Sequence, residues 1–322
     1  MEINHKNIKL WSTLGPRATL GLGIFDMAKS QKDILVITCD VSTSAGLDRY
    51  RKTFPDQYID LGIAEQNMIG VATGLARENF KVITTTFAPF QTMRCCEQIK
   101  VNLGYMEEKI TMVGLASGLV LGNLGFTHCC IEDVGVLRSI PNLSIISPAD
   151  SLETLKAVEA SIKHNNSCYI RLTGGSNNPI IYNENYEYKI GKSVKLKDGN
   201  DITIISNGAV AKDCLDVSIA LEKKNISTAV INMHTIKPID KEAILQASIK
   251  SKLIVTVEEH NIIGGLGSAV SEILSSARNS CKLLSLGVND TYTKSGSYKY
   301  LKSYYRLVSE KILEDINKSL ND

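Results

Sequence analysis

The sequence of 322 residues lacks the charge and the long apolar runs that would direct it to a nucleic acid or a membrane. Its 36 basic and 34 acidic residues leave a formal net charge of only +2, too little for a polyanion-binding surface. Apolar runs such as 202–205 are far shorter than the roughly 18 residues of a membrane-spanning helix, and residues 1–6 contain no apolar core of a signal peptide. We therefore expect a cytoplasmic protein that binds neither nucleic acid nor membrane.

Cysteine pairs with metal-binding spacing are also missing. None of the eight cysteines forms a C-x-x-C motif, and adjacent cysteines, as at 95–96 and 129–130, rarely bind one metal together. A disulfide framework is unusual in a chain of this size. We expect the cysteines to be small buried hydrophobic residues, and we expect the chain itself to hold no metal.

What the sequence does have is a regular alternation of short β-branched apolar runs and longer helical patterns. This alternation is typical of doubly wound α/β domains with mostly parallel sheets. At about 150 residues per domain the length predicts about two domains. The pattern breaks in a Gly-, Asn- and Tyr-rich stretch, so we predict one domain over 1–178, a linker over 179–197 and a second domain over 198–322. Strands are expected at 34–38, 82–85, 110–113, 144–146, 168–172, 202–205, 228–231, 253–257 and 282–286. Helices are expected at 19–30, 66–78, 92–102, 133–139, 152–164, 211–223, 241–248 and 266–277.

The densest chemical signal is Asp-Leu-Gly-Ile-Ala-Glu-Gln at 60–66, which leads into an apolar helical pattern. Glu65 then lies at the start of a helix. One interpretation is an acid in the first turn that favours the helix dipole. The other is a carboxyl group buried in apolar surroundings, whose pKa would rise and which could share a proton with a bound heterocycle.

Aromatic residues are scarce, yet two of the six phenylalanines directly follow a predicted strand. Phe87, Phe90 and Met93 are spaced by three, so they would line one side of a helical turn. Such a stripe is either ordinary core packing or a platform on which a flat ring stacks. The carboxyl end of a strand in an α/β sheet is where ligands bind, which favours the second interpretation.

Two glycine-rich segments could also bind a ligand. Residues 118–128 deliver His128 after a predicted strand, as either a structural histidine or part of a binding loop. Residues 258–268 have the strand, glycine turn and helix that can cradle an anion. The second segment is a weak nucleotide signal, because Val270 stands where the dinucleotide fingerprint needs its third glycine.

Taken together, these segments resemble the C-terminal half of transketolase, and more narrowly the C-terminal subunit of split-gene transketolases. The segments that carry the resemblance are Gly-Ile-Ala-Glu-Gln at 62–66, Thr-Phe-Ala-Pro-Phe at 86–90, Gly-Phe-Thr-His at 125–128, Leu-Arg-Ser-Ile-Pro-Asn at 137–142 and Glu-His-Asn-Ile-Ile-Gly-Gly-Leu-Gly at 259–267. They occur in the family's order and span nearly the whole chain. The resemblance implies a pyrimidine-binding domain followed by a transketolase C-terminal domain, both α/β.

The resemblance also implies roles for individual residues. Glu65 matches the catalytic glutamate that hydrogen-bonds N1′ of the thiamin diphosphate aminopyrimidine. Phe87 and Phe90 match the aromatic residues that pack on the pyrimidine, with Met93 on the same side. His128 matches a catalytic histidine that faces the reacting sugar and can move a proton.

Further residues match substrate-binding positions of the family. Arg17, Ser44 and Arg171 fall where the family contacts the phosphate of the sugar. Arg94 is another substrate-binding candidate, because a related synthase uses an arginine near this position. An arginine can hold a phosphate through paired charge-assisted hydrogen bonds.

The sequence departs from the family at two substrate positions. Leu124 replaces an aspartate that contacts a donor hydroxyl, and Ala116 replaces a second substrate histidine. We therefore expect a deoxygenated, branched or acyl donor in place of the usual sugar phosphate, because an apolar wall leaves a buried hydroxyl without a partner.

A Gly-Asp-Gly motif is missing from the whole sequence. In the family this motif holds the Mg²⁺ that binds the cofactor's diphosphate, and it lies in an N-terminal domain. The resemblance thus implies a separate N-terminal transketolase subunit that holds Mg²⁺ and the diphosphate, in an α₂β₂ assembly with the cofactor shared between chains.

The function predicted from the sequence is transfer of a two-carbon ketol or acyl unit between sugars or sugar phosphates. One alternative is the β subunit of a 2-oxoacid dehydrogenase E1 component, which has a similar layout and a similar glutamate. A non-catalytic paralogue is the other alternative.

Overall fold

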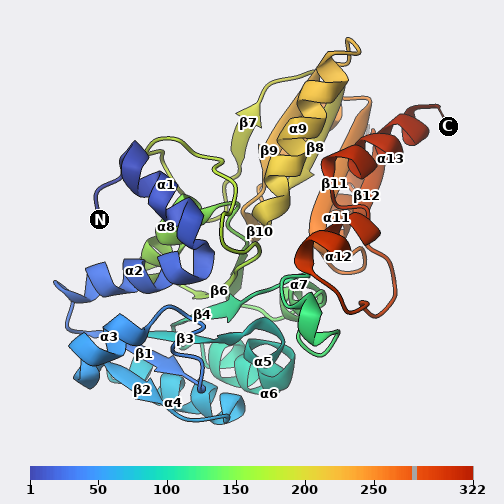
Figure 1. The fold of residues 1–322 in the computed structure, drawn as a ribbon. Coiled ribbons are helices and arrows are strands. Elements are labelled where there is room, and N and C mark those ends of the chain that lie inside the picture. Colours follow the sequence, from blue (N-terminus) through green and yellow to red (C-terminus); the bar gives the residue numbers. More distant parts are fainter. Residues whose placement is uncertain (278–280, 322) are drawn as a thin grey trace.

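The computed structural model describes residues 1–277 and 281–321, which form two α/β units, each built on one sheet (Figure 1). The first sheet has seven strands in the order β10-β5-β6-β4-β3-β1-β2, and the second has five in the order β12-β11-β8-β9-β7. Each sheet is covered by helices on both faces, so the predicted α/β fold with mostly parallel sheets is confirmed.

The first sheet is parallel except at one edge. Its strands are β1 (Ile34–Thr38), β2 (Tyr58–Asp60), β3 (Lys81–Phe87), β4 (Ile110–Leu115), β5 (Leu143–Ile146), β6 (Ser167–Arg171) and β10 (Thr235–Lys237). Only β10 runs antiparallel, beside β5. The central strands are buried on both faces, which is why they read as unbroken apolar runs.

Helices cover the two faces of this sheet. They are α1 (His5–Leu14), α2 (Pro16–Ala28), α3 (Asp48–Thr53), α4 (Glu65–Arg77), α5 (Ala88–Gln91), α6 (Cys96–Gln98), α7 (Asp133–Arg138) and α8 (Ser151–Lys163). Helices α2 and α8 pack on one face, while α4 and α7 pack on the other. The helix predicted over 92–102 is wrong as a single element: a 3₁₀ turn at Met93–Cys95, α6 and a π-helical segment at Ile99–Tyr105 replace it, and α5 comes directly before them. Pro89 sits in the first turn of α5, where its missing N–H costs nothing, so the helical chain begins earlier than predicted.

The second sheet has one antiparallel edge strand. Its strands are β7 (Val194–Lys197), β8 (Ile202–Ser206), β9 (Thr228–Asn232), β11 (Leu253–Asn261) and β12 (Lys282–Val288). Its helices are α9 (Ala211–Glu222), α10 (Lys241–Lys250), α11 (Leu266–Ser275), α12 (Tyr298–Tyr304) and α13 (Ser309–Asn321). Helices α9 and α13 cover one face, and α10 and α11 cover the other.

Each unit contributes residues to the sheet or the core of the other. Strand β10 follows β9 in the chain but belongs to the first sheet, on the far side of the predicted linker. In the other direction, Leu119, Cys129 and Ile131 precede the linker but are buried in the core between the second sheet and α9 and α13.

The state of the cysteines agrees with the expectation from the sequence for most of them. All eight cysteines are free thiols, six of them buried. Over the residues that the structure describes, none of the helices combines the length and apolarity needed to cross a bilayer.

Candidate active site

Three segments that are distant in sequence meet at the carboxyl edge of the first sheet. Glu65 begins α4, which follows β2. Phe87 ends β3 and Phe90 lies in α5, directly after it. His128 lies in the loop between β4 and α7. Loops at this edge of a parallel sheet are the usual place for a binding site, since the backbone framework beneath them is rigid.

Glu65 is the first residue of α4, and its side chain is buried, with 3% of the residue exposed. The carboxylate is therefore both at a helix N-terminus and buried. Its partner is Arg94, whose Nη1 donates to Glu65 Oε1 at 2.9 Å. The guanidinium offsets part of the cost of burying the carboxylate charge.

Phe87 and Phe90 form an aromatic pair beside this carboxylate. Phe87 ends β3, Phe90 lies in α5, and their ring centroids are 6.5 Å apart at 75°. The Arg94 guanidinium carbon lies 4.0 Å from the Phe90 ring centroid, so Arg94 contacts both the carboxylate and the aromatic face. Both phenylalanines are only partly buried and Met93 is exposed, so the three side chains are not wholly core residues.

The His128 ring packs edge-on against the same aromatic pair. Its centroid lies 5.3 Å from that of Phe90 and 6.3 Å from that of Phe87. Its Nδ1 is 3.0 Å from Thr127 Oγ1, so one ring nitrogen has a partner within its own loop. The structure thus brings Glu65, Phe90 and His128 into one continuous set of contacts through Arg94.

The two departures from the family pattern lie in different environments. Leu124 is in a short 3₁₀ turn and is 56% exposed. Phe126 is also 56% exposed and packs against Tyr292 of the second unit, with centroids 5.2 Å apart. Ala116 is fully buried and has a φ of 53°, so it presents no side chain to an open surface. Of the two positions, only Leu124 presents a side chain that a substrate could contact.

Arg171 requires a correction, because its side chain is fully buried. Its Nε and Nη2 donate to Asp133 at 2.9 and 3.2 Å, and Nη2 also donates to the Glu259 carbonyl at 3.1 Å. Burial alone would raise the pKa of Asp133, but Arg171 and His260 more than offset it and hold that pKa below its usual range. Arg171 forms a buried ion pair with Asp133, so its guanidinium is not accessible to a substrate phosphate.

Arg17 and Ser44 remain candidates on adjoining segments. Arg17 lies in the first turn of α2, and burial lowers its pKa. Ser44 lies in the turn before α3 and is partly buried. The Gly46 backbone in that turn approaches Arg17 so closely that a Cβ at Gly46 would lie 3.1 Å from the Arg17 carbonyl oxygen.

The anion cradle expected at 258–268 is filled by the chain itself. Glu258 Oε2 and Oε1 accept hydrogen bonds from the N–H groups of Leu266 and Gly267, at 2.6 and 2.8 Å, at the start of α11. The buried carboxylate occupies the position that an anion would take.

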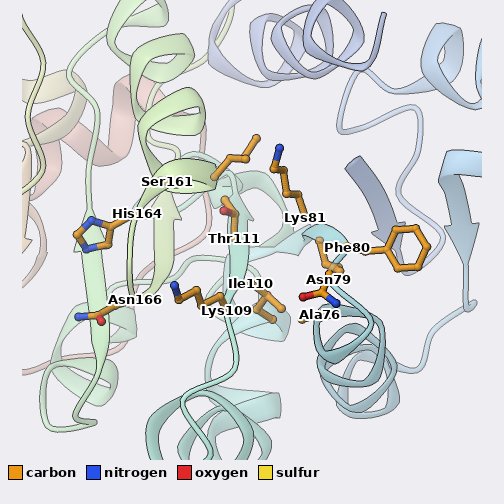
Figure 2. A pocket seen from close by; sticks show the side chains of 12 residues that line it. Ala76, Asn79, Phe80, Lys81, Lys109, Ile110, Thr111, Ser161, His164 and Asn166 are labelled. Atoms are coloured by element: carbon orange, nitrogen blue, oxygen red, sulfur yellow. The ribbon is translucent and has the colours of Figure 1, made fainter. Parts of the chain in front are cut away.

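A cavity of about 210 Å³ lies at the opposite edge of the first sheet. Figure 2 shows side chains that line it, among them Lys81, Lys109 and His164. Lys81 begins β3 and Ile110 begins β4, so the cavity is at the amino ends of the strands, away from the edge where a parallel sheet binds ligands. Two helices, α4 and α8, also end there, and their terminal carbonyls disfavour an anion. We do not assign the activity to this cavity.

Metal ligands are not clustered in the part of the chain that the structure describes. Across residues 1–277 and 281–321, no three His, Cys, Asp or Glu side chains are grouped so that they could hold a metal ion.

Comparison with known proteins matches two family models to successive parts of the chain. Residues 14–178 match the family model for the transketolase pyrimidine binding domain, and residues 191–312 match that for the transketolase C-terminal domain. The chain is 34% identical over 310 residues to a putative transketolase C-terminal section of Methanocaldococcus jannaschii, covering 94% of this chain and 97% of that protein. It is 34% identical over 289 residues to one subunit of the apulose-4-phosphate transketolase of Phocaeicola vulgatus, covering 90% and 92%. A solved split-gene transketolase, described as an inactive β4 tetramer, superposes with a TM-score of 0.88 at 30% identity, covering 96% of this chain and 99% of that one.

Proposed function

Because the chain belongs to the transketolase family, we propose that it is one subunit of a two-chain transketolase-type transferase and supplies the pyrimidine half of a thiamin diphosphate site. The observation that carries this proposal is the buried Glu65 carboxylate, placed beside the Phe87–Phe90 pair and His128 at the carboxyl edge of the first sheet.

The residues present fit an aminopyrimidine. A buried carboxylate can share a proton with a ring nitrogen, and a partly exposed aromatic face can pack on a flat ring. The Arg94 guanidinium, itself flat and hydrogen-bonding, already makes both contacts, on Glu65 Oε1 and on the Phe90 face. Glu65 and Phe90 would hold the pyrimidine, and Phe87 and Met93 would complete that side. When bound, thiamin diphosphate supplies the carbon nucleophile and the electron sink for the transferred unit.

The side chains of this subunit then have separate tasks. Glu65 holds a proton at the ring nitrogen N1′ and returns it during turnover. Arg94 is 41% exposed and long enough to leave Glu65 Oε1, and its guanidinium is then available to an anionic substrate. His128 takes or gives a proton at the reacting end of the donor, and the phenylalanines exclude water from the carboxylate.

We further propose that a separate N-terminal subunit holds the diphosphate and Mg²⁺. The 322 residues contain no Gly-Asp-Gly motif. Of the relatives described above, one is named as a C-terminal section and another as a single subunit of its transketolase, which supports a partner chain. With that partner, the assembly is proposed to be α₂β₂.

The donor is proposed to be a ketose or acyl compound that lacks a hydroxyl, or carries a carbon branch, opposite Leu124. An apolar side chain there leaves a donor hydroxyl without a partner, which costs about 1–3 kcal/mol when the site is closed to water. Every relative described above carries a transketolase name, and no observation favours the β subunit of a 2-oxoacid dehydrogenase or a non-catalytic paralogue.

The test is a calorimetric titration with thiamin diphosphate and Mg²⁺. The chain alone should show no Mg²⁺-dependent micromolar binding, whereas the chain reconstituted with a Gly-Asp-Gly-containing partner should bind and should turn over ketose donors. Tight Mg²⁺-dependent binding by the chain alone would contradict the shared site. A complex that binds the cofactor but transfers no two-carbon unit from any ketose or acyl donor would contradict the activity.

A further inference from the structure

The loop that carries His128 belongs to the first unit by sequence and to the second by packing. This loop, residues 116–131 and hereafter the His128 loop, leaves the first sheet after β4 and leads to α7. Near both ends, however, its apolar side chains at Leu119, Cys129 and Ile131 are buried in the core of the second unit. His128 directly precedes Cys129, so the anchor is one residue from the imidazole.

The second unit holds this loop in a crevice where a doubly wound domain ordinarily binds a ligand. Strand β8 connects to β9 on one side, whereas β11 lies on its other side, so the order of the sheet reverses between β8 and β11. Ligands of open α/β sheets bind outside the carboxyl ends of the strands at that reversal. Here the first unit occupies the position: Ala209 N, after β8, donates to Thr173 Oγ1 at 2.9 Å, and Asn261 N, at the end of β11, donates to the Ile131 carbonyl at 2.8 Å.

Glu259 makes the central contact in this crevice. It lies on β11 and is 1% exposed; its Oε1 accepts from the Tyr298 hydroxyl at 2.5 Å and its Oε2 from Leu119 N at a long 3.5 Å. A Cβ at Gly118 would lie 2.9 Å from Glu259 Oε2, so glycine permits this close approach. Gly118 has a φ of 69° and exchanges backbone hydrogen bonds of 2.8 and 2.9 Å with Cys130, which ties the two ends of the loop together.

We propose that the second unit positions His128 for catalysis, with Glu259 and Tyr298 as the positioning residues. The backbone around His128 is fixed by the second unit, while its ring packs on Phe87 and Phe90 of the first. The distance between His128 and Glu65 is therefore set by a domain that contributes neither residue. That His128 is a catalytic residue rests on the function proposed above, whereas the positioning of its ring by the second unit does not.

The positioning can be tested on the full-length chain by NMR of its histidine Cε1–H groups, of which there are five. His128→Gln identifies the His128 signal by its disappearance. Tyr298→Phe removes only the hydroxyl that donates to Glu259 Oε1. Glu259→Gln changes the acceptor of the same hydrogen bond, so the test can be done with one variant if the other does not fold. Tyr300→Phe is the matched control, since Tyr300 lies on the same helix and is 49% exposed.

In Tyr298→Phe and Glu259→Gln the His128 signal should shift by more than its linewidth, because the ring lies 5.3 Å from the Phe90 ring and senses any change in that packing. In Tyr300→Phe it should coincide with the wild-type signal. The proposal is overturned if the signal of His260, next to Glu259 in sequence, moves while that of His128 does not. Such a result would mean that the crevice is disturbed without consequence for the loop.

Kinetics of the reconstituted enzyme provide a second, separate readout. Misplacing His128 should lower kcat by about 10- to 100-fold in Tyr298→Phe, since small errors in the position of a catalytic group have effects of that size. The apparent Kd of thiamin diphosphate should be unchanged, because the cofactor residues are untouched. Equal losses of kcat and cofactor affinity would contradict positioning. An inactive wild-type complex with a shifted His128 signal in the variants would refute the proposed function and leave the positioning intact.

Discussion

Replacing Arg171 with methionine tests whether this arginine is a buried structural ion or a substrate ligand. The Arg171 and Asp133 side chains are both completely buried and joined by hydrogen bonds of 2.9 and 3.2 Å. Methionine keeps much of the volume but leaves Asp133 ionised in the core with the Tyr169 hydroxyl, 2.7 Å away, as its main hydrogen-bond donor. Breaking a buried pair by removing one partner costs about 3–5 kcal/mol.

That loss is a large share of the total free energy of unfolding, because folded domains are stable by only about 5–15 kcal/mol. Urea unfolding followed through Trp11, the single tryptophan and 2% exposed, should therefore show a much lower midpoint for Arg171→Met. Arg77→Met is the control: Arg77 pairs with Glu108 at 3.3 Å but is 60% exposed, so its loss should cost less than about 1 kcal/mol.

The pH dependence of the difference in unfolding free energy between the wild type and Arg171→Met gives a second check. In the wild type, Arg171 and His260 hold the pKa of Asp133 below its usual range, so this group stabilises the fold above about pH 4 and loses that contribution as the pH falls through the lowered pKa. Without Arg171, burial should raise the pKa of Asp133, and protonation should then relieve the unpaired charge. The difference in unfolding free energy between wild type and variant should shrink as the pH falls from 7 toward about 5. A cost below about 1 kcal/mol at pH 7, with substrate affinity lost instead, would refute the structural role.

Three further substitutions test the candidate site in the reconstituted enzyme. Glu65→Gln keeps the size of the side chain but cannot cycle a proton, so kcat should fall by at least about 10²-fold, and activity within about threefold of wild type would exclude a catalytic role. Phe90→Ala should raise the apparent Kd of thiamin diphosphate about tenfold, by analogy with stacking of a base on an aromatic ring; a lower melting temperature with unchanged affinity would make Phe90 a core residue only. Leu124→Asp should raise kcat/KM for xylulose 5-phosphate by about 10-fold through one recovered hydrogen bond, and efficient use of that donor by the wild type, at about 10⁴ M⁻¹s⁻¹ or better, would show that Leu124 does not select the donor.

The sequence predicted most of the strands of both sheets because their burial leaves short, unbroken apolar runs. Strand β1, for example, was predicted with the bounds that the structure has, Ile34–Thr38. Strand β10 was missed because three residues carry no period and its pairing with β5 is a tertiary contact. Helix α1 was missed although Asn4 is a good N-cap, whose side chain accepts from Asn7 N at 2.9 Å.

The candidate site shows the same limit. The family resemblance predicted that Glu65, Phe90 and His128 serve one site, and the structure places all three at the carboxyl edge of the first sheet. The motifs did not reveal the Arg94–Glu65 pair, whose members are 29 residues apart, or the burial of Arg171, which depends on Asp133 across 38 residues. Position in a motif indicates which loop holds a residue, but whether its side chain reaches solvent is decided by packing from elsewhere in the chain.

The sharing of core residues between the two units has a consequence for how this chain can be divided. A break at the linker would take β10 from the first sheet and leave Leu119, Cys129 and Ile131 exposed on the first fragment. Each fragment would thus lack part of its own interior, however intact its remaining sheet. The two units are therefore expected to unfold in one cooperative transition. Splitting the gene at the linker is expected to destabilise both of the resulting fragments.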